Sequence, residues 1–382
     1  MTLDQKPVVI FTTMHNANDH RIYYKEARSL SKKYPVIIVA PLRGNGRITE
    51  VHHKRISFIS NRLFRFVTNI RHIPTVWRLN PRVVHIHDPE LLTIALILKL
   101  FTRAKIIYDA HENQHIDILQ KEWLPVMLRK LILFIYKSVE YIVLKNADGL
   151  ILAEDSYLET YNKFKNTEII RNYPVTEMHA TPKAVDRKTF DVIRLGYIGS
   201  VQRIRGTLEM LHLVSCIKHI HRRDVRLDVI GAFENEKLER EALPLVESLN
   251  IEACVRFTGF LPHESAVKLL AEVHIGLALF HPLPTHQRIL PVKLYEYMLM
   301  HKPVIATDIA LWHSVLARHK CGIFVDPFDA ENTAKTVLSL YEDPNTIEEM
   351  GKNGYSAVVQ EYNWATQEKL LYRFYEQVIG KN

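Results

Sequence analysis

Short apolar runs alternate with helix-like patterns from one end of this chain to the other. In the first half, strand-like runs lie at residues 8–12, 36–40, 83–87, 105–108, 149–152 and 168–170. In the second half, they lie at residues 192–198, 227–230, 255–257, 275–279, 304–306 and 323–325. Apolar strands that are joined through helices indicate parallel sheets covered by helices on both faces. The order of these elements therefore predicts an α/β protein.

A polar stretch without periodicity, residues 174–188, separates the two series. We interpret it as a linker, because a chain of 382 residues exceeds the usual size of one hydrophobic core. We expect doubly wound, Rossmann-like domains over residues 1–180 and 190–360, facing each other across a cleft. Residues 361–382 are expected to form a C-terminal helix that crosses back to the first domain.

Positive charge is concentrated in the first half of the chain. Residues 1–190 carry 29 Lys and Arg against 18 Asp and Glu, whereas the remainder carries 21 against 24. Two segments, 62–82 and 121–145, interleave cations with aliphatic and aromatic side chains, which suits an anionic membrane surface. Helices packed on a sheet with their cations facing water would show the same pattern. Nucleic acid fits less well, because no nucleic-acid-binding motif accompanies the charge.

The sequence also limits where the protein acts. Its longest apolar run, residues 91–101, is shorter than the roughly 18 residues that a membrane span needs. The polar first residues do not follow the plan of a secretory signal, and three widely spaced cysteines give neither a disulfide framework nor a zinc pattern. We expect a cytoplasmic protein that is peripheral on the inner face of the plasma membrane. The oligomeric state stays open.

A loop of small and basic residues opens the second series. After the strand at residues 192–198 come Gly199, Ser200, Arg203 and Arg205, and a helical pattern begins at Leu208. Small residues let a ligand approach the backbone, and the N-terminus of the following helix attracts anions. Such a loop suits a diphosphate, although Gly and Arg also occur in turns that bind nothing.

The tract PVKLYEYMLMHKPVIAT, residues 291–307, places Lys293 and Glu296 on an amphipathic segment just ahead of a buried strand. A carboxylate there can accept two hydrogen bonds from a ribose diol, while Lys293 offers positive potential to phosphate. The tract predicts a nucleotide site. An ordinary amphipathic helix with a solvated Lys and Glu is the alternative.

The spacing of these motifs resembles retaining GT-B glycosyltransferases of family 4. The matching stretches are YIGSVQRIRGT at 197–207, PVKLYEYM at 291–298, KPVIAT at 302–307, HIHDPELL at 85–92 and IIYDAHEN at 106–113. They follow the family order over nearly the whole chain. The resemblance implies a GT-B fold and transfer of a hexosyl or N-acetylhexosaminyl group from a UDP- or GDP-linked sugar. The implied acceptor is lipid-linked, an oligosaccharide or a polysaccharide, in bacterial cell-surface glycan synthesis.

The resemblance also implies which residues form the site. The catalytic residues are His111, Arg203, Arg205 and Lys293, with Asp109 and Glu112 beside His111. Donor-binding residues are Gly199, Ser200, Arg288, Leu290, Glu296 and Tyr297. Acceptor-side residues are Asn16, Asp19, Arg21, His87 and Asp88. Fixed cations would neutralise the departing diphosphate, so that no metal or other cofactor is expected, and no Asp-x-Asp motif is present to hold one.

Departures from the family keep other functions open. Arg288 stands where many relatives have a glutamate near the donor sugar, and the turn at residues 12–16 lacks their paired glycines. A nucleotide-sugar 2-epimerase of the same fold and a non-catalytic partner subunit that binds nucleotide sugar are the alternatives. His85 and His87 lie on one face of a strand and could pair at a metal, as in amidohydrolases. A dinucleotide-dependent oxidoreductase is disfavoured, because no Gly-x-Gly-x-x-Gly run follows a strand.

Overall fold

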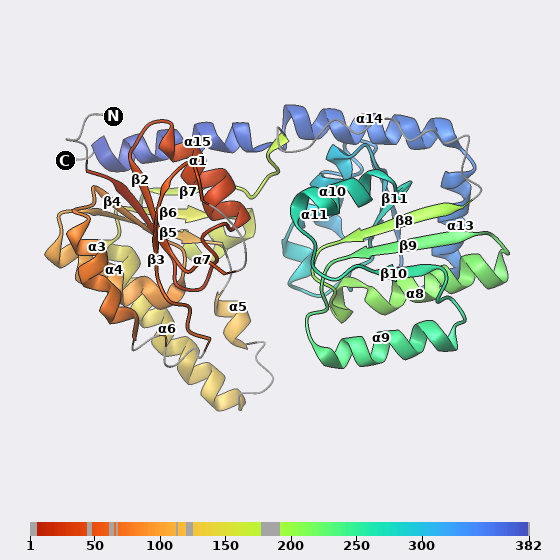
Figure 1. Cartoon of the computed structure of the whole chain (residues 1–382), viewed down its shortest axis with the longest axis horizontal. Helices are drawn as coiled ribbons and strands as arrows, with labels where there is room; N and C mark the ends of the chain where they lie inside the picture. The colour runs from red at the N-terminus through yellow and green to blue at the C-terminus, as the bar shows by residue number, and fades with distance from the viewer. Residues whose placement is uncertain are drawn as a thin grey trace. The chain divides into compact units, whose positions relative to one another are not determined.

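The computed structural model describes residues 6–43, 48–60, 65, 68–111, 114–119, 125–176 and 192–380 (Figure 1). The chain divides into two compact units. Unit 1 comprises Met1–Asn172 together with Trp364–Asn382, and unit 2 comprises Tyr173–Asn363. Much of the predicted linker lies outside the described residues.

Unit 1 is built on a parallel sheet with the strand order β3-β2-β1-β4-β5-β6-β7. Its strands are β1 (Val8–Phe11), β2 (Val36–Ala40), β3 (His52–Arg55), β4 (Val83–Ile86), β5 (Lys105–Ala110), β6 (Gly149–Leu152) and β7 (Thr167–Ile169). The inner strands are apolar and almost fully buried, as two covered faces require. Strand β3 was not predicted from the sequence, because its residues are polar and largely exposed at the edge of the sheet.

Helices cover both faces of this sheet. They are η1 (His20–Ala27), α1 (Arg28–Ser31), η2 (Asn69–His72), α3 (Ile73–Arg78), η3 (Pro89–Leu91), α4 (Leu92–Phe101), α5 (Gln114–Leu119), α6 (Val126–Asn146), η4 (Asp155–Tyr157), α7 (Leu158–Tyr161) and α15 (Trp364–Gly380). The last of these, α15, packs on unit 1, although it follows unit 2 in the chain. Its Trp364 Nε1 donates to Ser29 Oγ over 2.8 Å, and its Tyr375 hydroxyl lies 2.8 Å from His85 Nδ1.

Unit 2 has a second parallel sheet, in the order β10-β9-β8-β11-β12-β13. Its strands are β8 (Ile193–Ile198), β9 (Val225–Ile230), β10 (Val255–Phe257), β11 (Ile275–Ala278), β12 (Val304–Thr307) and β13 (Gly322–Val325). Its helices are η7 (Arg203–Arg205), α8 (Thr207–Ser215), η8 (Cys216–Ile220), α9 (Glu236–Ser248), α10 (His263–Ala271), η9 (His286–Arg288), α11 (Val292–Leu299), α12 (Ala310–His313), α13 (Ala330–Tyr341) and α14 (Pro344–Gln360). Two parallel sheets covered by helices confirm the predicted α/β class.

The strand order of each sheet shows where a ligand can bind. In unit 1 the chain reverses its direction of winding between β1 and β4, and in unit 2 between β8 and β11. The loops after such neighbouring strands diverge and leave a crevice at the carboxyl ends of the strands. The loops after β1, β4, β8 and β11 are therefore the places to look for a site. Within the described parts of the chain, the helices fall short of the length and hydrophobicity that would cross a membrane.

Candidate functional site

The loop after β8 is held in a conformation that requires glycine. Gly206 has a φ of +82°, and a Cβ added there would lie 2.0 Å from the carbonyl oxygen of Leu279 at the end of β11. Gly199 has a φ of +116°. Both values lie in the region that glycine adopts without steric cost. The loop therefore packs closely against the end of β11 and leads into α8.

Two cations converge on Gly199. A Cβ built on Gly199 would lie 3.6 Å from Lys293 Nζ and 4.0 Å from Arg205 Nη1. Lys293 comes from the first turn of α11, and only 5% of its surface is exposed. Its ammonium lies 3.5 Å from the centre of the Tyr197 ring, where the π face attracts a cation.

The Lys293 ammonium has no hydrogen-bond acceptor among the described residues. Burial and then the positive charge of Arg205 hold the pKa of Lys293 well below its usual value, while the Glu296 carboxylate opposes this shift. Glu296 is half-buried and lies one helical turn after Lys293. A buried cation without an acceptor is costly, and an anion beside Gly199 would supply the missing partner.

Two predicted site residues of unit 2 have other roles. The Arg203 guanidinium pairs with Glu241 of α9 at the surface, so that it is already engaged with a carboxylate. Tyr297 is fully buried; its hydroxyl donates to Leu277 O over 2.8 Å and accepts from Ile198 N over 3.2 Å. Tyr297 thus ties β8 to β11 and positions the loop. Its assignment as a donor-binding residue stays a prediction.

The other predicted donor residues lie on the same edge of unit 2. Ser200 is exposed, and its carbonyl accepts from the Tyr197 hydroxyl over 2.6 Å. Arg288 is exposed on η9, and Leu290 packs against the core of unit 2. The segment that carries them is fixed, since Trp312 Nε1 donates to Ile289 O over 2.9 Å. The predicted assignments of these three residues to the donor stay predictions.

In unit 1, a carboxylate from the segment just after β4 organises the loop after β1. Asp88 is fully buried and accepts from the Thr12 hydroxyl over 2.8 Å and from the Met14 amide over 3.0 Å. It also accepts from the amide and hydroxyl of Thr13. The backbone amides that could have held a phosphate here are thus occupied by a protein carboxylate. Asp88 therefore shapes the loop, and its assignment to the acceptor side stays a prediction.

The loop after β1 meets His111 at the end of β5. His15 Nε2 and His111 Nε2 lie 3.0 Å apart, and His111 Nδ1 lies 3.4 Å from the Asp109 carbonyl oxygen. One of these rings must therefore donate to the other.

Asp19, predicted on the acceptor side, lies 4.0 Å from His15 Nδ1 and caps η1. His15 was missed by the sequence analysis; its position just after β1, at the reversal of the sheet, is the signal that could have found it. Glu112 lies outside the described residues.

Arg21 and His87 belong to a buried polar cluster beneath this loop. Arg21 donates to Asp109 Oδ2 over 2.7 and 3.1 Å and to Ile170 O over 2.9 Å. Glu26 Oε1 lies 3.0 Å from Arg21 Nε, and Glu26 Oε2 lies 3.3 Å from His87 Nε2. All these side chains are buried, and they support the loop from below. The assignment of Arg21 and His87 to the acceptor side stays a prediction.

The same cluster contains potential metal ligands. Donor atoms of Glu26, His85, His87 and Asp109 all lie within 4.8 Å of one another. Arg21 already neutralises one carboxylate, so a divalent ion would leave this buried cluster with a net positive charge. Burial, followed by the charge of Asp109, raises the pKa of Glu26 well above its usual value. The raised pKa favours the neutral form of Glu26, in which the charge of Arg21 balances that of Asp109.

Comparisons with known proteins show what this chain is similar to. Residues 193–343, which make up most of unit 2, match the family described as "Glycosyl transferases group 1". A curated relative, the alpha-D-kanosaminyltransferase of Streptomyces kanamyceticus, is 25% identical over 134 residues, which are 35% of this chain. The match spans only 33% of that relative's length.

Solved structures extend the similarity to the whole chain. Sucrose-phosphate synthase from Thermosynechococcus elongatus superposes with a TM-score of 0.78 at 17% identity, covering 99% of this chain and 100% of that one. HepE from Anabaena, solved with UDP and glucose, superposes with a TM-score of 0.73 at 12% identity, covering 97% and 99%. The predicted GT-B fold is confirmed.

Proposed function

We propose that this chain is a retaining glycosyltransferase that moves a hexosyl or N-acetylhexosaminyl group from a UDP- or GDP-linked donor. The proposed acceptor is a lipid-linked or polysaccharide glycan of the bacterial cell surface. The observation that carries the proposal is the convergence of Lys293 and Arg205 on Gly199, with the Lys293 ammonium buried and lacking an acceptor. The structure of HepE with UDP and glucose supports a nucleotide sugar as the donor.

The chemistry follows from charge. Cleavage of the sugar–phosphate bond develops negative charge on the departing diphosphate, and cations fixed beside it stabilise the transition state more than the ground state. Lys293 and Arg205 supply these cations, so that the reaction needs no metal. Glu296, one turn along α11, accepts hydrogen bonds from the ribose diol. In a front-side attack, which retains the configuration, the leaving phosphate takes the proton of the acceptor hydroxyl.

The test uses the full chain and a panel of UDP- and GDP-linked sugars, each with and without a polyprenyl-linked acceptor and with EDTA. The proposal expects nucleotide release that depends on acceptor and persists in EDTA. Release of a free epimer would favour a 2-epimerase. Tight donor binding without turnover would favour a non-catalytic subunit. Either outcome would remove the transferase proposal.

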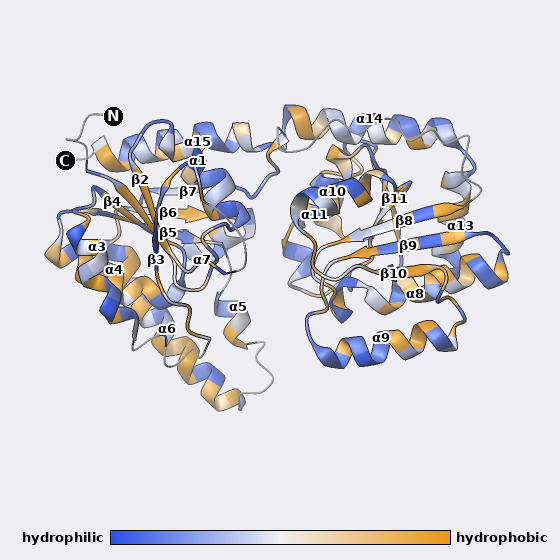
Figure 2. Cartoon of the chain, viewed as in Figure 1, coloured by the Kyte–Doolittle hydropathy of each residue, from blue (hydrophilic) through white to orange (hydrophobic). Residues whose placement is uncertain are grey.

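A second part of the proposal concerns the membrane. Helix α6 exposes Met127 to 79% and Phe134 to 69%, and the neighbouring end of α4 exposes Leu100 to 83%. Figure 2 shows hydrophobic residues recurring along the length of α6. Arg129 and Lys130 lie on the same helix. Apolar side chains flanked by cations suit an anionic bilayer, with the protein peripheral on the inner face of the plasma membrane.

Vesicle co-sedimentation tests this part. We expect binding to phosphatidylglycerol vesicles that weakens as salt is added, since salt screens the attraction. Replacing Met127 and Phe134 together by Ser should reduce binding without unfolding the protein, because both side chains are exposed. Equal binding to phosphatidylcholine vesicles would count against an electrostatic contribution.

A further inference from the structure

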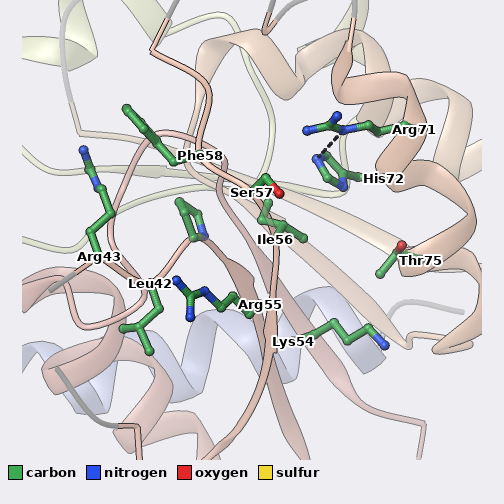
Figure 3. Close-up of a pocket in the computed structure, with 11 residues that line it drawn as sticks. Leu42, Arg43, Lys54, Arg55, Ile56, Ser57, Phe58, Arg71, His72 and Thr75 are labelled. Atoms are coloured by element: carbon green, nitrogen blue, oxygen red, sulfur yellow. Dashed lines mark hydrogen bonds between the residues drawn. The ribbon is translucent and has the colours of Figure 1, made fainter. Parts of the chain in front are cut away.

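Unit 1 contains a basic pocket at the carboxyl ends of two strands. The pocket has a volume of about 750 Å³ and is lined by the ends of β2 and β3 and by η2 and α3 (Figure 3). This volume lies within the range of small-molecule sites, about 300–1,000 Å³. The pocket opens on the edge of the sheet where parallel strands end, which is the edge that binds ligands in such sheets.

Cations dominate the wall of this pocket. Its lining includes Arg43, Lys54, Arg55 and Arg71 and, among the described residues, no Asp or Glu. Two arginines of unit 1 that lie outside the pocket form ion pairs with carboxylates: Arg28 pairs with Glu50 over 2.7 Å, and Arg65 pairs with Glu90 over 2.6 Å. A concave wall that gathers cations without a carboxylate concentrates positive potential and favours an anion.

Part of this wall is already ordered. The Arg43 guanidinium lies 4.0 Å from the centre of the Phe58 ring and donates to Met14 O over 3.1 Å. Opposite these residues, Arg71 Nε donates to His72 Nε2 over 3.5 Å (Figure 3). Burial and Arg71 lower the pKa of His72 to about 4, so that this imidazole is neutral at physiological pH. Fixed side chains lose less conformational entropy when a ligand binds.

The pocket is bonded to the loop that carries His15. The Arg43 amide donates to Asn16 Oδ1 over 3.0 Å, and Asn16 Nδ2 donates to Arg43 O over 3.0 Å. His15 precedes Asn16, and its ring lies against His111. A ligand bound in the pocket would therefore contact the loop whose His15 ring lies against His111. Asn16, predicted on the acceptor side, forms the connection.

We propose that this pocket binds the diphosphate of the acceptor, so that the substrate class is a glycan joined to its carrier through a diphosphate. The inference rests on the proposed function and specifies its acceptor. Arg and Lys side chains supply the paired donors that phosphate oxygens require. A neutral glycan would instead need carboxylates or carbonyls to accept from its hydroxyls, and the described lining has no carboxylate.

The first test measures binding of inorganic pyrophosphate by calorimetry. The full chain is first saturated with UDP, so that the cations of unit 2 are occupied. We expect Arg55→Gln and Arg71→Gln each to weaken pyrophosphate binding roughly tenfold, the loss of one charge-assisted hydrogen bond. Arg55→Lys should retain part of the affinity, and Arg78→Gln, on the same helix as the pocket wall but outside the lining, should retain all of it.

Three outcomes decide the proposal. A diphosphate-linked acceptor whose KM rises in the Arg55→Gln, Arg71→Gln double variant, but not in Arg78→Gln, would support it. Unchanged pyrophosphate affinity in the double variant would overturn it while leaving UDP binding, and so the proposed function, intact. Loss of binding to phosphatidylglycerol vesicles without loss of pyrophosphate binding would also overturn it, because the cations would then serve a membrane lipid. A chain that binds no UDP would remove the proposed function instead.

Discussion

Arg21 in unit 1 and Lys293 in unit 2 are both buried cations, and they differ in their partners. Arg21 in unit 1 donates to Asp109 and to the Ile170 carbonyl, and Glu26 lies beside it. Lys293 in unit 2 contacts the Tyr197 ring and has no hydrogen-bond acceptor among the described residues. Burial of a charge is costly unless it is paired. The paired cation therefore supports the fold, whereas the unpaired one marks a place where a ligand completes the structure.

Removing Arg21 gives the first and largest test of this contrast. Arg21→Met should lower the free energy of unfolding by about 3–5 kcal/mol, because it leaves the buried Asp109 carboxylate without its cation. Urea denaturation of the variant beside the wild type measures the change. A loss below about 1 kcal/mol, the worth of a surface pair, would show that Arg21 does not stabilise this cluster.

Removing Lys293 should lower turnover strongly but should not lower the free energy of unfolding. Lys293→Met takes away the cation proposed at the departing diphosphate, and turnover should fall by about 10²–10³-fold, as for other fixed transition-state donors. The ligand-free protein should keep or gain stability, because a buried, unsatisfied ammonium is replaced by an apolar chain of similar length. Steady-state kinetics measure the turnover, and urea denaturation of the same preparation measures the stability. If Lys293→Met were destabilised as strongly as Arg21→Met, the two cations would not differ in their role in the fold.

Arg203 and Arg205, both in the loop after β8, allow an arginine that pairs with a carboxylate to be compared with one that faces Gly199 within unit 2. Arg205→Ala should lower turnover by about 10²-fold, because Arg205 faces Gly199 beside Lys293. Arg203→Ala is the matched control: its guanidinium pairs with Glu241, so we expect a change of only a few-fold. Kinetics with the donor varied at saturating acceptor would separate them. Equal losses of turnover in both variants would indicate that Arg203 also acts on the donor.

The sequence predicts the architecture well, because buried parallel strands carry continuous apolar runs that alternate with helices. Among the strands in the described part of the chain, only β3 was not predicted, since an edge strand such as His52–Arg55 needs no apolar side chains. Motif spacing predicted that Lys293 and Glu296 act together, and the structure places both on one turn of α11. The spacing could not tell that Tyr297, next in the chain, points into the core, or that Arg203 finds a partner in α9. Those outcomes depend on contacts between residues far apart in sequence, as do the pairing of His15 with His111 and the basic pocket.

The last and smallest expected effect concerns the acid beside Arg21. Burial raises the pKa of Glu26 above its ordinary value of 4.5, and the nearby Asp109 adds to the shift. A raised folded-state pKa contributes stability that is fully present below pH 4.5 and is lost as the pH rises through the folded pKa. Glu26→Gln keeps the neutral form at every pH.

We therefore expect Glu26→Gln to match the wild type within about 1 kcal/mol below pH 4.5, where the raised pKa keeps Glu26 uncharged. As the pH rises above 4.5, the wild type should lose stability relative to the variant, because only the folded wild type binds a proton that the unfolded chain releases. Urea denaturation over a series of pH values measures the difference. If Glu26→Gln were instead destabilised as strongly as Arg21→Met, Glu26 would be an ionised partner of Arg21. That outcome would contradict the raised pKa of Glu26.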